Sequence, residues 1–316
     1  MGRKKRLVRD RSVNVRLTPR DFKILQIVLS YRFIRTPEIV VLIGGSAQRI
    51  KNRLRKLYDA GYLARPQKQK QEGWMNKPAI YAMGDQIRRD VRDGLRGAEE
   101  IEEKGINLAV IGRQDWTSKN REVRSPHIEH ALMTTRFRVC LELACRQDPD
   151  AELLYWYGDR QIKDRVSYHD GKKGVIKLPV HPDGFFCLRV DGEKKWYFFE
   201  ADRHTETQIA SSLKKSTIYR KMLAYWEFWK KRRFKEADSP FESLKMDNFR
   251  VLFVAMSDAR ALNIMESARL ADPKRKGSNM FMSSYQAKYD DLKNPKKIIE
   301  PIWRVPTSEN SLFGLW

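Results

Sequence analysis

The 316-residue sequence predicts a mixed α+β / α/β protein with two domains. Two threonine-proline pairs, Thr18-Pro19 and Thr36-Pro37, are typical helix starts, because threonine caps a helix and proline fits its first turn. Asp191-Gly192 stands between two runs of apolar and aromatic residues, which predicts a tight hairpin. Together these signals favour a helical N-terminal domain followed by a domain built around strands.

The net charge of the chain indicates which kind of partner the protein binds. There are 63 Lys and Arg against 40 Asp and Glu, a net charge of +23, and residues 1–100 hold 24 basic and 10 acidic residues, or +14. Such a concentration is typical of a protein that binds a polyanion, with nucleic acid as the expected partner. No stretch approaches the roughly 20 apolar residues of a membrane helix, so no membrane association is expected. The three cysteines form no CxxC pair, which favours reduced thiols in a cytoplasm.

Residues 18–84 are predicted to form a winged helix-turn-helix, preceded by a basic arm over residues 1–17. Three helices should be followed by two strands that enclose a basic turn, which is the element order of that module. The expected elements are helices from Pro19, over Thr36–Ile43 and over Ser46–Ala60, and strands at Tyr62–Leu63 and Ala79–Met83.

In a winged helix the third helix enters the major groove, where Arg, Gln and Asn pair with base edges. The outward residues of this helix and two lysines of the basic turn are therefore predicted contacts of double-stranded DNA: Gln48, Arg49, Lys51, Asn52, Arg53, Arg55, Lys56, Lys68 and Lys70. The alternatives are a solvated basic helix face and a winged helix used for protein contacts.

Residues 85–124 are charged and weakly periodic, which predicts a helical linker with one helix near 85–104. Residues 125–271 are expected to fold as the second domain, and 272–316 as an irregular C-terminal extension. The second domain should run helix, three strands, helix, strand, helix over residues 125–145, 152–157, 184–190, 194–200, 211–232, 249–256 and 259–270.

If Asp191 and Gly192 are the two residues of the loop, Val190 faces Glu193. The residue numbers of every facing pair along the hairpin then add up to 383. Phe185 then faces Phe198, and Asp183 faces Glu200 with Cβ atoms about 4.5–5.5 Å apart. Asp202 falls on the same face, so three carboxylates should converge at the open end of the hairpin.

Carboxylates that close together repel one another unless a cation or proton intervenes. Hard oxygen ligands suit Mg²⁺ or Mn²⁺, which would activate water and polarise a phosphate. Lys221 borders the buried face of the following helix and could reach these acids. The alternative is a set of surface acids that pair with Arg203, Arg189 or Lys194.

This order of elements, with Pro182-Asp183 and then Glu200-x-Asp202, resembles the core of the PD-(D/E)xK nuclease superfamily. The whole chain, over roughly residues 18–260, resembles the plasmid replication-relaxation family. The segments that carry this resemblance are the N-terminal winged helix, His130-Ala131-Leu132, Pro182-Asp183-Gly184, Phe199–Glu206 and Lys221–Tyr225.

The resemblance implies that Asp183 and Glu200 bind the metal, with Glu129 as a supporting acid. The superfamily's lysine normally lies two residues after the second acid, where this chain has Asp202. Either Lys221 or Lys214 has taken over that role, or the fold binds DNA without cutting it. The candidate catalytic set is Asp183, Glu200, Asp202 and Lys221.

Two functions follow from these patterns. The first is replication or relaxation of plasmid or mobile-element DNA by metal-dependent nicking. The second is a non-catalytic regulator of transcription or replication on a degenerate nuclease fold. RNA binding is the third and least favoured. The resemblance implies a bacterial protein of the cytoplasm, nucleoid or plasmid, with a homodimer and replication or mobilisation proteins as further expected partners.

Overall fold

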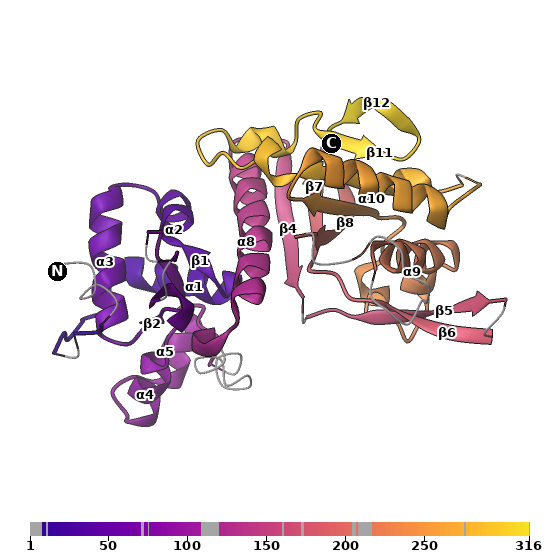
Figure 1. Ribbon diagram of the computed structural model, residues 1–316. Coiled ribbons are helices and arrows are strands. Elements are labelled where there is room, and N and C mark those ends of the chain that lie inside the picture. Colours follow the sequence, from indigo (N-terminus) through magenta and orange to yellow (C-terminus); the bar gives the residue numbers. More distant parts are fainter. Residues whose placement is uncertain are drawn as a thin grey trace. The chain divides into compact units, whose positions relative to one another are not determined.

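The computed structural model describes residues 8–10, 12–70, 73–74, 76–108, 120–159, 161–171, 174–203, 207, 217–274 and 276–315. The chain divides into two compact units, Met1–Arg136 and Phe137–Trp316 (Figure 1). Among the described helices, none is long and apolar enough to cross a membrane.

Residues 19–83 of the N-terminal unit form the helices α1, α2 and α3 and a small antiparallel sheet with the strand order β1-β3-β2. Its elements are α1 (Pro19–Tyr31), β1 (Ile34–Arg35), α2 (Thr36–Ile43), α3 (Ala47–Asp59), β2 (Leu63–Ala64) and β3 (Ile80–Met83). The three helices and the last two strands have the order expected from the sequence, whereas β1 was not predicted. The assignment to the winged-helix class stays a prediction. The three helices bury an apolar stripe, including Ile24, Leu54 and Leu57, that closes the core of this unit.

Charged side chains connect the helices of this unit from inside. Asp21 is fully buried, and its carboxylate accepts hydrogen bonds from the backbone N–H of Thr18 at 2.6 Å and the Thr18 hydroxyl at 2.7 Å. Arg53 on α3 donates to the same carboxylate, with its Nε 2.5 Å from Asp21 Oδ1. One acid therefore caps α1 and holds α3 against it.

The loop between β2 and β3 is folded back by a buried glutamine. Its start forms a 3-10 turn, Gln67–Lys70, where the sequence predicted only a basic turn. The Gln69 side chain donates to the Pro78 carbonyl at 3.0 Å and accepts from the Ile80 N–H at 3.0 Å. Lys68 lies in this turn, and the side chain of Lys70 lies outside the described residues.

Two short helices, α4 (Gln86–Arg92) and α5 (Ala98–Glu103), stand where a single linker helix was expected. Gly94, with a φ of 69°, separates them, because a left-handed residue ends a helix. The long helix α8 (Ser125–Arg146) begins in the N-terminal unit and ends in the C-terminal one.

The C-terminal unit is built on a mixed seven-stranded sheet with the order β12-β11-β10-β9-β8-β7-β4. β8 pairs with β9 and β9 with β10 in parallel, and the other neighbours are antiparallel. The strands are β4 (Ala151–Gly158), β7 (Gly184–Val190), β8 (Glu193–Ala201), β9 (Arg250–Ala255), β10 (Phe281–Tyr285), β11 (Trp303–Val305) and β12 (Ser308–Phe313).

Alternating aromatic residues of β7 and β8 build a core on each face of this sheet. On one face, the ring of Phe199 stacks 4.2 Å from Phe137 on the C-terminal part of α8. On the other, Phe198 contacts Tyr225 and Phe228 of α9 (Ile218–Lys230). The helix α10 (Asp258–Ala271) packs into this second core, so the sheet lies between helices.

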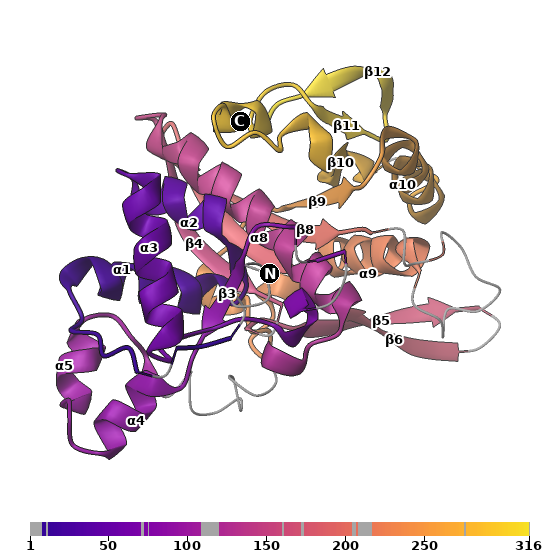
Figure 2. The ribbon, with the colours of Figure 1, turned by 60° about the vertical axis from the view of Figure 1, so that its left-hand side comes forward.

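The predicted helix, three strands, helix, strand order of this unit is confirmed, with one addition. Between β4 and β7 the chain forms a separate two-stranded sheet, β5 (Asp164–Asp170) and β6 (Gly174–Val180), which the sequence did not predict. In Figures 1 and 2 this hairpin projects beyond the main sheet beside α9. Short 3-10 helices complete the unit at Arg233–Lys235, Glu242–Leu244, Ser278–Met280, Gln286–Lys288 and Pro295–Ile298.

Residues 272–316 were expected to be irregular, and the structure corrects this. They contribute β10, β11 and β12, three of the seven strands of the main sheet. The sequence signal is weak because β10 contains two serines, Ser283 and Ser284, that are buried although they are polar. The hydroxyl of Ser283 donates to the Ala261 carbonyl at 2.9 Å, so this buried polar group has a hydrogen-bond partner.

Replacement of the buried acid of α1 tests how the N-terminal unit is held together. Burial would raise the pKa of Asp21, but the hydrogen bonds from Arg53 and Thr18 outweigh it and lower that pKa. The stabilisation is therefore complete above the ordinary pKa of aspartate and lost as the pH falls through the lower folded value. Asp21→Asn should reduce the free energy of unfolding at pH 7 by about 2 kcal/mol.

Urea denaturation at pH 7 and at acidic pH, with hydrogen exchange of the α1 and α3 amides, measures this effect. The matched control is Asp93→Asn, which removes an acid that pairs with Arg92 at the surface of the same unit. Equal stability of the two variants at pH 7 would contradict the assigned role of Asp21.

Candidate active site

The β7–β8 hairpin has the register predicted from its turn. Asp191 and Gly192 have φ angles of 51° and 84°, as a type I′ turn requires. Val190 pairs with Glu193 and Phe185 with Phe198, and the ladder ends at Gly184 and Phe199. The turn therefore determines which side chains reach the open end of the hairpin.

Asp183 lies one residue beyond this ladder, against the end of β8. Its N–H donates to the Phe199 carbonyl at 3.0 Å, and its Oδ2 accepts from the Ala201 N–H at 2.9 Å. The next residue is Gly184, where a Cβ atom would lie 2.7 Å from the ring of Trp156. A residue without a side chain is thus required beside Asp183, and the carboxylate is held by the backbone of its partner strand.

Glu200 is the buried acid of the site, with only 2% of its surface exposed. Its two oxygens bind different residues of α9. The Tyr225 hydroxyl donates to Oε1 at 2.6 Å, and the Lys221 ammonium donates to Oε2 at 2.9 Å. Lys221 and Tyr225 are four residues apart, so they lie on one face of the helix. Thr217 begins that helix by accepting from the Arg220 N–H at 3.1 Å.

The pKa of Glu200 is raised to about 7, chiefly by burial; Lys221 opposes this shift and Asp183 adds to it. The pKa of Tyr225 is also well above its ordinary value, because the ring is buried and Glu200 lies beside it. Tyr225 therefore stays a hydrogen-bond donor. The site combines two close carboxylates, one ammonium group and one neutral phenol.

The structure places Asp202 in a different contact from the predicted one. Its carboxylate forms an ion pair with Arg260 of α10, and both side chains are largely buried. Its N–H donates to the Val254 carbonyl at 2.8 Å. The alternation of β8 ends at Ala201, so Asp202 need not share the face of Glu200. Asp202 is thus bound by Arg260, and its part in the predicted cluster of three carboxylates stays a prediction.

Two other predicted members of the site, Glu129 and Lys214, stay predictions. Glu129, predicted as a supporting acid, lies on α8 in the N-terminal unit, where its carboxylate is 3.9 Å from the Lys77 ammonium. Its role as a metal ligand stays a prediction. Lys214, the alternative to Lys221, lies outside the described residues.

Within the described ranges, no group of three or more His, Cys, Asp or Glu side chains is arranged to hold a metal ion. Asp183 and Glu200 offer a pair. A pair fits Mg²⁺, which keeps several waters and uses one or two carboxylates together with substrate phosphates. Mn²⁺ accepts the same oxygen ligands. The donor set therefore fits a hydrated ion shared with a phosphate.

The predicted DNA-contacting residues of α3 separate into two groups. Gln48, Arg49, Lys51, Asn52 and Lys56 are exposed. Two arginines instead contact the protein itself. Arg53 pairs with Asp21, and Arg55 pairs with Asp59 at 2.7 Å and donates to the Val8 carbonyl at 2.9 Å. The exposed set is the surface that this helix offers to a partner.

Two side chains that contact the predicted acids were not expected from the sequence. Tyr225 is the first of them. Its position one turn after Lys221, as a hydroxyl within an apolar stripe, was the available signal. Arg260 carried no local signal, because its contact with Asp202 joins residues 58 positions apart.

A sequence profile described as replication-relaxation matches residues 25–244. No curated protein matches the chain. A solved structure of restriction endonuclease FokI is similar at 10% identity and a TM-score of 0.31, covering 90% of this chain and 45% of that one. The chain thus spans less than half of the FokI structure, and a TM-score this low supports no transfer of fold or activity.

The pKa of Glu200 makes stability depend on pH. The pKa of Glu200 in the folded protein, about 7, lies above its ordinary value of 4.5. The neutral acid therefore contributes fully to the free energy of unfolding below pH 4.5, and this contribution is lost as the pH rises through 7. Glu200→Gln keeps a neutral side chain at every pH. Between pH 4.5 and 8 its free energy of unfolding should rise relative to wild type by on the order of 3 kcal/mol.

Chemical denaturation at a series of pH values measures this difference. Glu152→Gln is the matched control, because Glu152 is 60% exposed and pairs with Arg189 at the surface of β4 and β7. If wild type and Glu200→Gln lost or gained stability in parallel across this range, the raised pKa would be refuted.

Proposed function

Because the chain belongs to the replication-relaxation family, we propose that it binds double-stranded DNA of a bacterial plasmid or other mobile element and nicks it with Mg²⁺ or Mn²⁺. One observation carries the catalytic part of this proposal. The Lys221 ammonium lies 2.9 Å from Glu200 Oε2, so a lysine of the following helix reaches this acid. The position two residues after Glu200, where the PD-(D/E)xK superfamily has its lysine, is occupied by Asp202 in this chain.

The residues of the site have complementary roles in phosphodiester hydrolysis. A divalent ion between Asp183 and Glu200 would supply an activated water and a polarised phosphate. Tyr225 holds Glu200 Oε1 in place, and the Ala201 N–H holds Asp183 Oδ2. The Lys221 ammonium stands at the edge of this pair and can donate to a phosphate oxygen, where it would stabilise negative charge that develops in the transition state.

The exposed face of α3 is the proposed DNA-reading surface. Gln48, Arg49 and Asn52 carry groups that pair with base edges, and Lys51 and Lys56 suit phosphates. Arg53 and Arg55 are assigned to holding the helix in place, because both are bound to acids of the same unit. Binding would therefore rest on five exposed side chains of this helix.

A second candidate function is a DNA-binding regulator of replication or transcription without nuclease activity. One observation favours it. In the part of the chain that the structure describes, the acids form a pair, and Lys221 already neutralises one of them. A site of this kind could stabilise the fold without binding a metal ion.

A supercoiled-plasmid assay with Mg²⁺ or Mn²⁺ separates the two functions. Wild type should convert supercoiled DNA to open circle, and Asp183→Ala, Glu200→Gln and Lys221→Met should each lower the rate by roughly 100-fold or more. Glu193→Gln and Lys230→Met are matched controls on the same hairpin and the same helix. Absence of nicking by wild type, with DNA binding intact, would favour the regulator.

Gel-shift titration over a range of salt concentrations tests the DNA-reading surface. Lys51→Ala and Lys56→Ala should each weaken duplex binding and reduce the salt dependence by about one phosphate contact. Lys23→Ala is the control, since Lys23 is exposed on α1 of the same unit. Equal losses in all three variants would show that α3 has no special part in binding.

A further inference from the structure

The positive charge of the C-terminal unit is concentrated in two segments. Residues 137–316 hold 33 Lys and Arg against 25 Asp and Glu, a net charge of +8. Residues 160–177 and 230–238 together hold 11 against 4, a net charge of +7. The rest of the unit is therefore close to neutral. Such a concentration is the signature of a surface that meets a polyanion.

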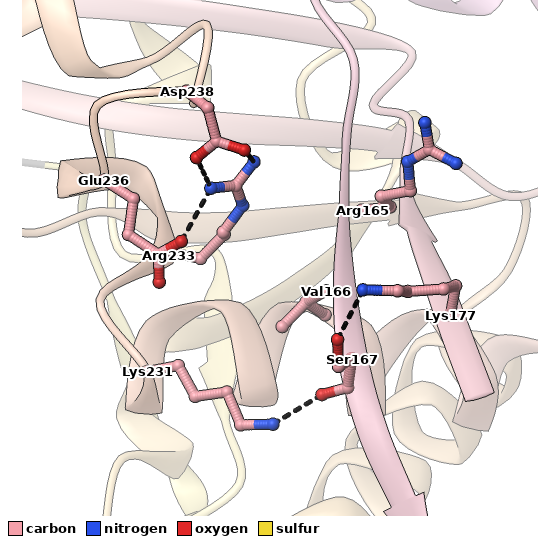
Figure 3. A pocket seen from close by; sticks show the side chains of 8 residues that line it. All are labelled: Arg165, Val166, Ser167, Lys177, Lys231, Arg233, Glu236 and Asp238. Carbon is pink, nitrogen blue, oxygen red and sulfur yellow. Dashed lines mark hydrogen bonds and ion pairs between the residues drawn. The ribbon is translucent and has the colours of Figure 1, made fainter. Parts of the chain in front are cut away.

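These two segments meet at a pocket of about 320 Å³ between the β5–β6 hairpin and the end of α9 (Figure 3). Arg165, Val166 and Ser167 line it from β5 and Lys177 from β6, while Lys231, Arg233, Glu236 and Asp238 line it from the segment after α9. Val166 is buried, so the polar residues form the accessible wall.

The acids of the pocket are occupied by one arginine. Arg233 donates to Glu236 at 2.7 Å, to Asp164 at 3.1 Å and to Asp238. Ser239 fixes the remaining oxygen of Asp164 at 2.8 Å. Arg233 therefore holds the chain after α9 against β5, and its single positive charge offsets part of the negative charge of the three carboxylates that it contacts.

The two lysines of the pocket converge on a single serine. Lys177 donates to the Ser167 hydroxyl at 2.7 Å, and Lys231 donates to the Ser167 carbonyl (Figure 3). Both ammonium groups are exposed. Glu227 is the acid nearest to Lys231, at 3.1 Å, but it also faces Lys230 at 3.3 Å. Two ammonium groups are thus held at one serine, Lys177 at its hydroxyl and Lys231 at its carbonyl.

Arg165 adds a third cation two residues before Ser167 on the same strand. Residues two apart in a strand lie on one face. Its guanidinium is exposed and makes no hydrogen bond or ion pair with any residue that the structure describes. It is therefore available to a ligand without the loss of an internal contact.

We propose that this pocket binds a phosphate group of the DNA backbone, with Lys177, Lys231 and Arg165 as donors. Ammonium and guanidinium groups are the usual partners of phosphate oxygens, and the Ser167 hydroxyl can add a further hydrogen bond. The inference rests on the proposed DNA-binding function and extends it, because it places a backbone contact in the C-terminal unit.

The helix α9 sets the separation of this pocket from the candidate active site. Lys221 lies near its start and Lys231 directly after its end. Ten residues of helix span about 15 Å. With a rise of about 3.4 Å per base pair, that distance corresponds to roughly four base pairs. For a duplex that runs along α9, the bound phosphate should therefore lie about four nucleotides from the nicked one.

Fluorescence anisotropy of the full chain with a labelled duplex, between about 50 and 200 mM salt, tests the proposal. The Lys177→Gln/Lys231→Gln double variant should reduce the slope of log affinity against log salt by about 2, and Arg165→Gln by about 1. Lys194→Gln/Lys195→Gln is the matched control, since it removes the same charge from the β7–β8 end of the unit. Melting temperatures verify that each variant is folded.

A second titration, with inorganic phosphate followed by calorimetry, identifies the source of the phosphate. Phosphate binding that the double variant loses, with an unchanged duplex slope, would assign the pocket to a small phosphorylated molecule and overturn the DNA contact. An unchanged slope and no phosphate binding would overturn the pocket itself while duplex binding by wild type persists. Failure of wild type to bind duplex would overturn the proposed function together with this contact.

Discussion

The buried carboxylate of Glu200 constrains the rest of the C-terminal unit. It lies on β8, the strand that pairs with β7 on one side and β9 on the other, where water cannot solvate it. Burial of an unpaired carboxylate costs several kcal/mol, so both oxygens need partners. Those partners, Lys221 and Tyr225, come from α9. The helix must therefore pack on the sheet with one rotation about its axis and one position along it. That packing also determines where the end of α9 lies, with Arg233 and the pocket between the β5–β6 hairpin and the end of α9.

Several arginines of this strongly basic chain form contacts within the protein instead of serving a partner. Arg53, Arg233 and Arg260 each hold a buried or largely buried acid and connect two elements of one unit. A planar guanidinium suits such contacts because it forms several hydrogen bonds in fixed directions. Lysines such as Lys51 and Lys177 remain exposed. The number of basic residues is therefore larger than the number available to bind a polyanion. The ion pairs identify the arginines that are already bound to acids of the protein.

The sequence was sufficient where the signal is local. Asp191-Gly192 predicted the turn, the turn predicted the register, and the register brought Asp183 to Glu200. Helical spacing put Lys221 near the same acids. The sequence failed where contacts join distant segments. The parallel pairing of β9 with β10 and the ion pair of Asp202 with Arg260 depend on the assembled sheet. A strand with buried serines also lacks the apolar alternation by which strands are recognised.

The β5–β6 hairpin leaves and rejoins the main sheet at a single point, because Gly158 of β4 pairs directly with Gly184 of β7. Its two ends are therefore fixed by the sheet whatever lies between them, and the entropic cost of a longer excursion grows only slowly with length. The buried side chains of the hairpin, among them Val166, Leu178 and Val180, nevertheless belong to the same core as Phe198 and Tyr225. Changes of charge that leave Asp183 and this core in place are therefore confined to the exposed positions of the hairpin, such as Arg165 and Lys177.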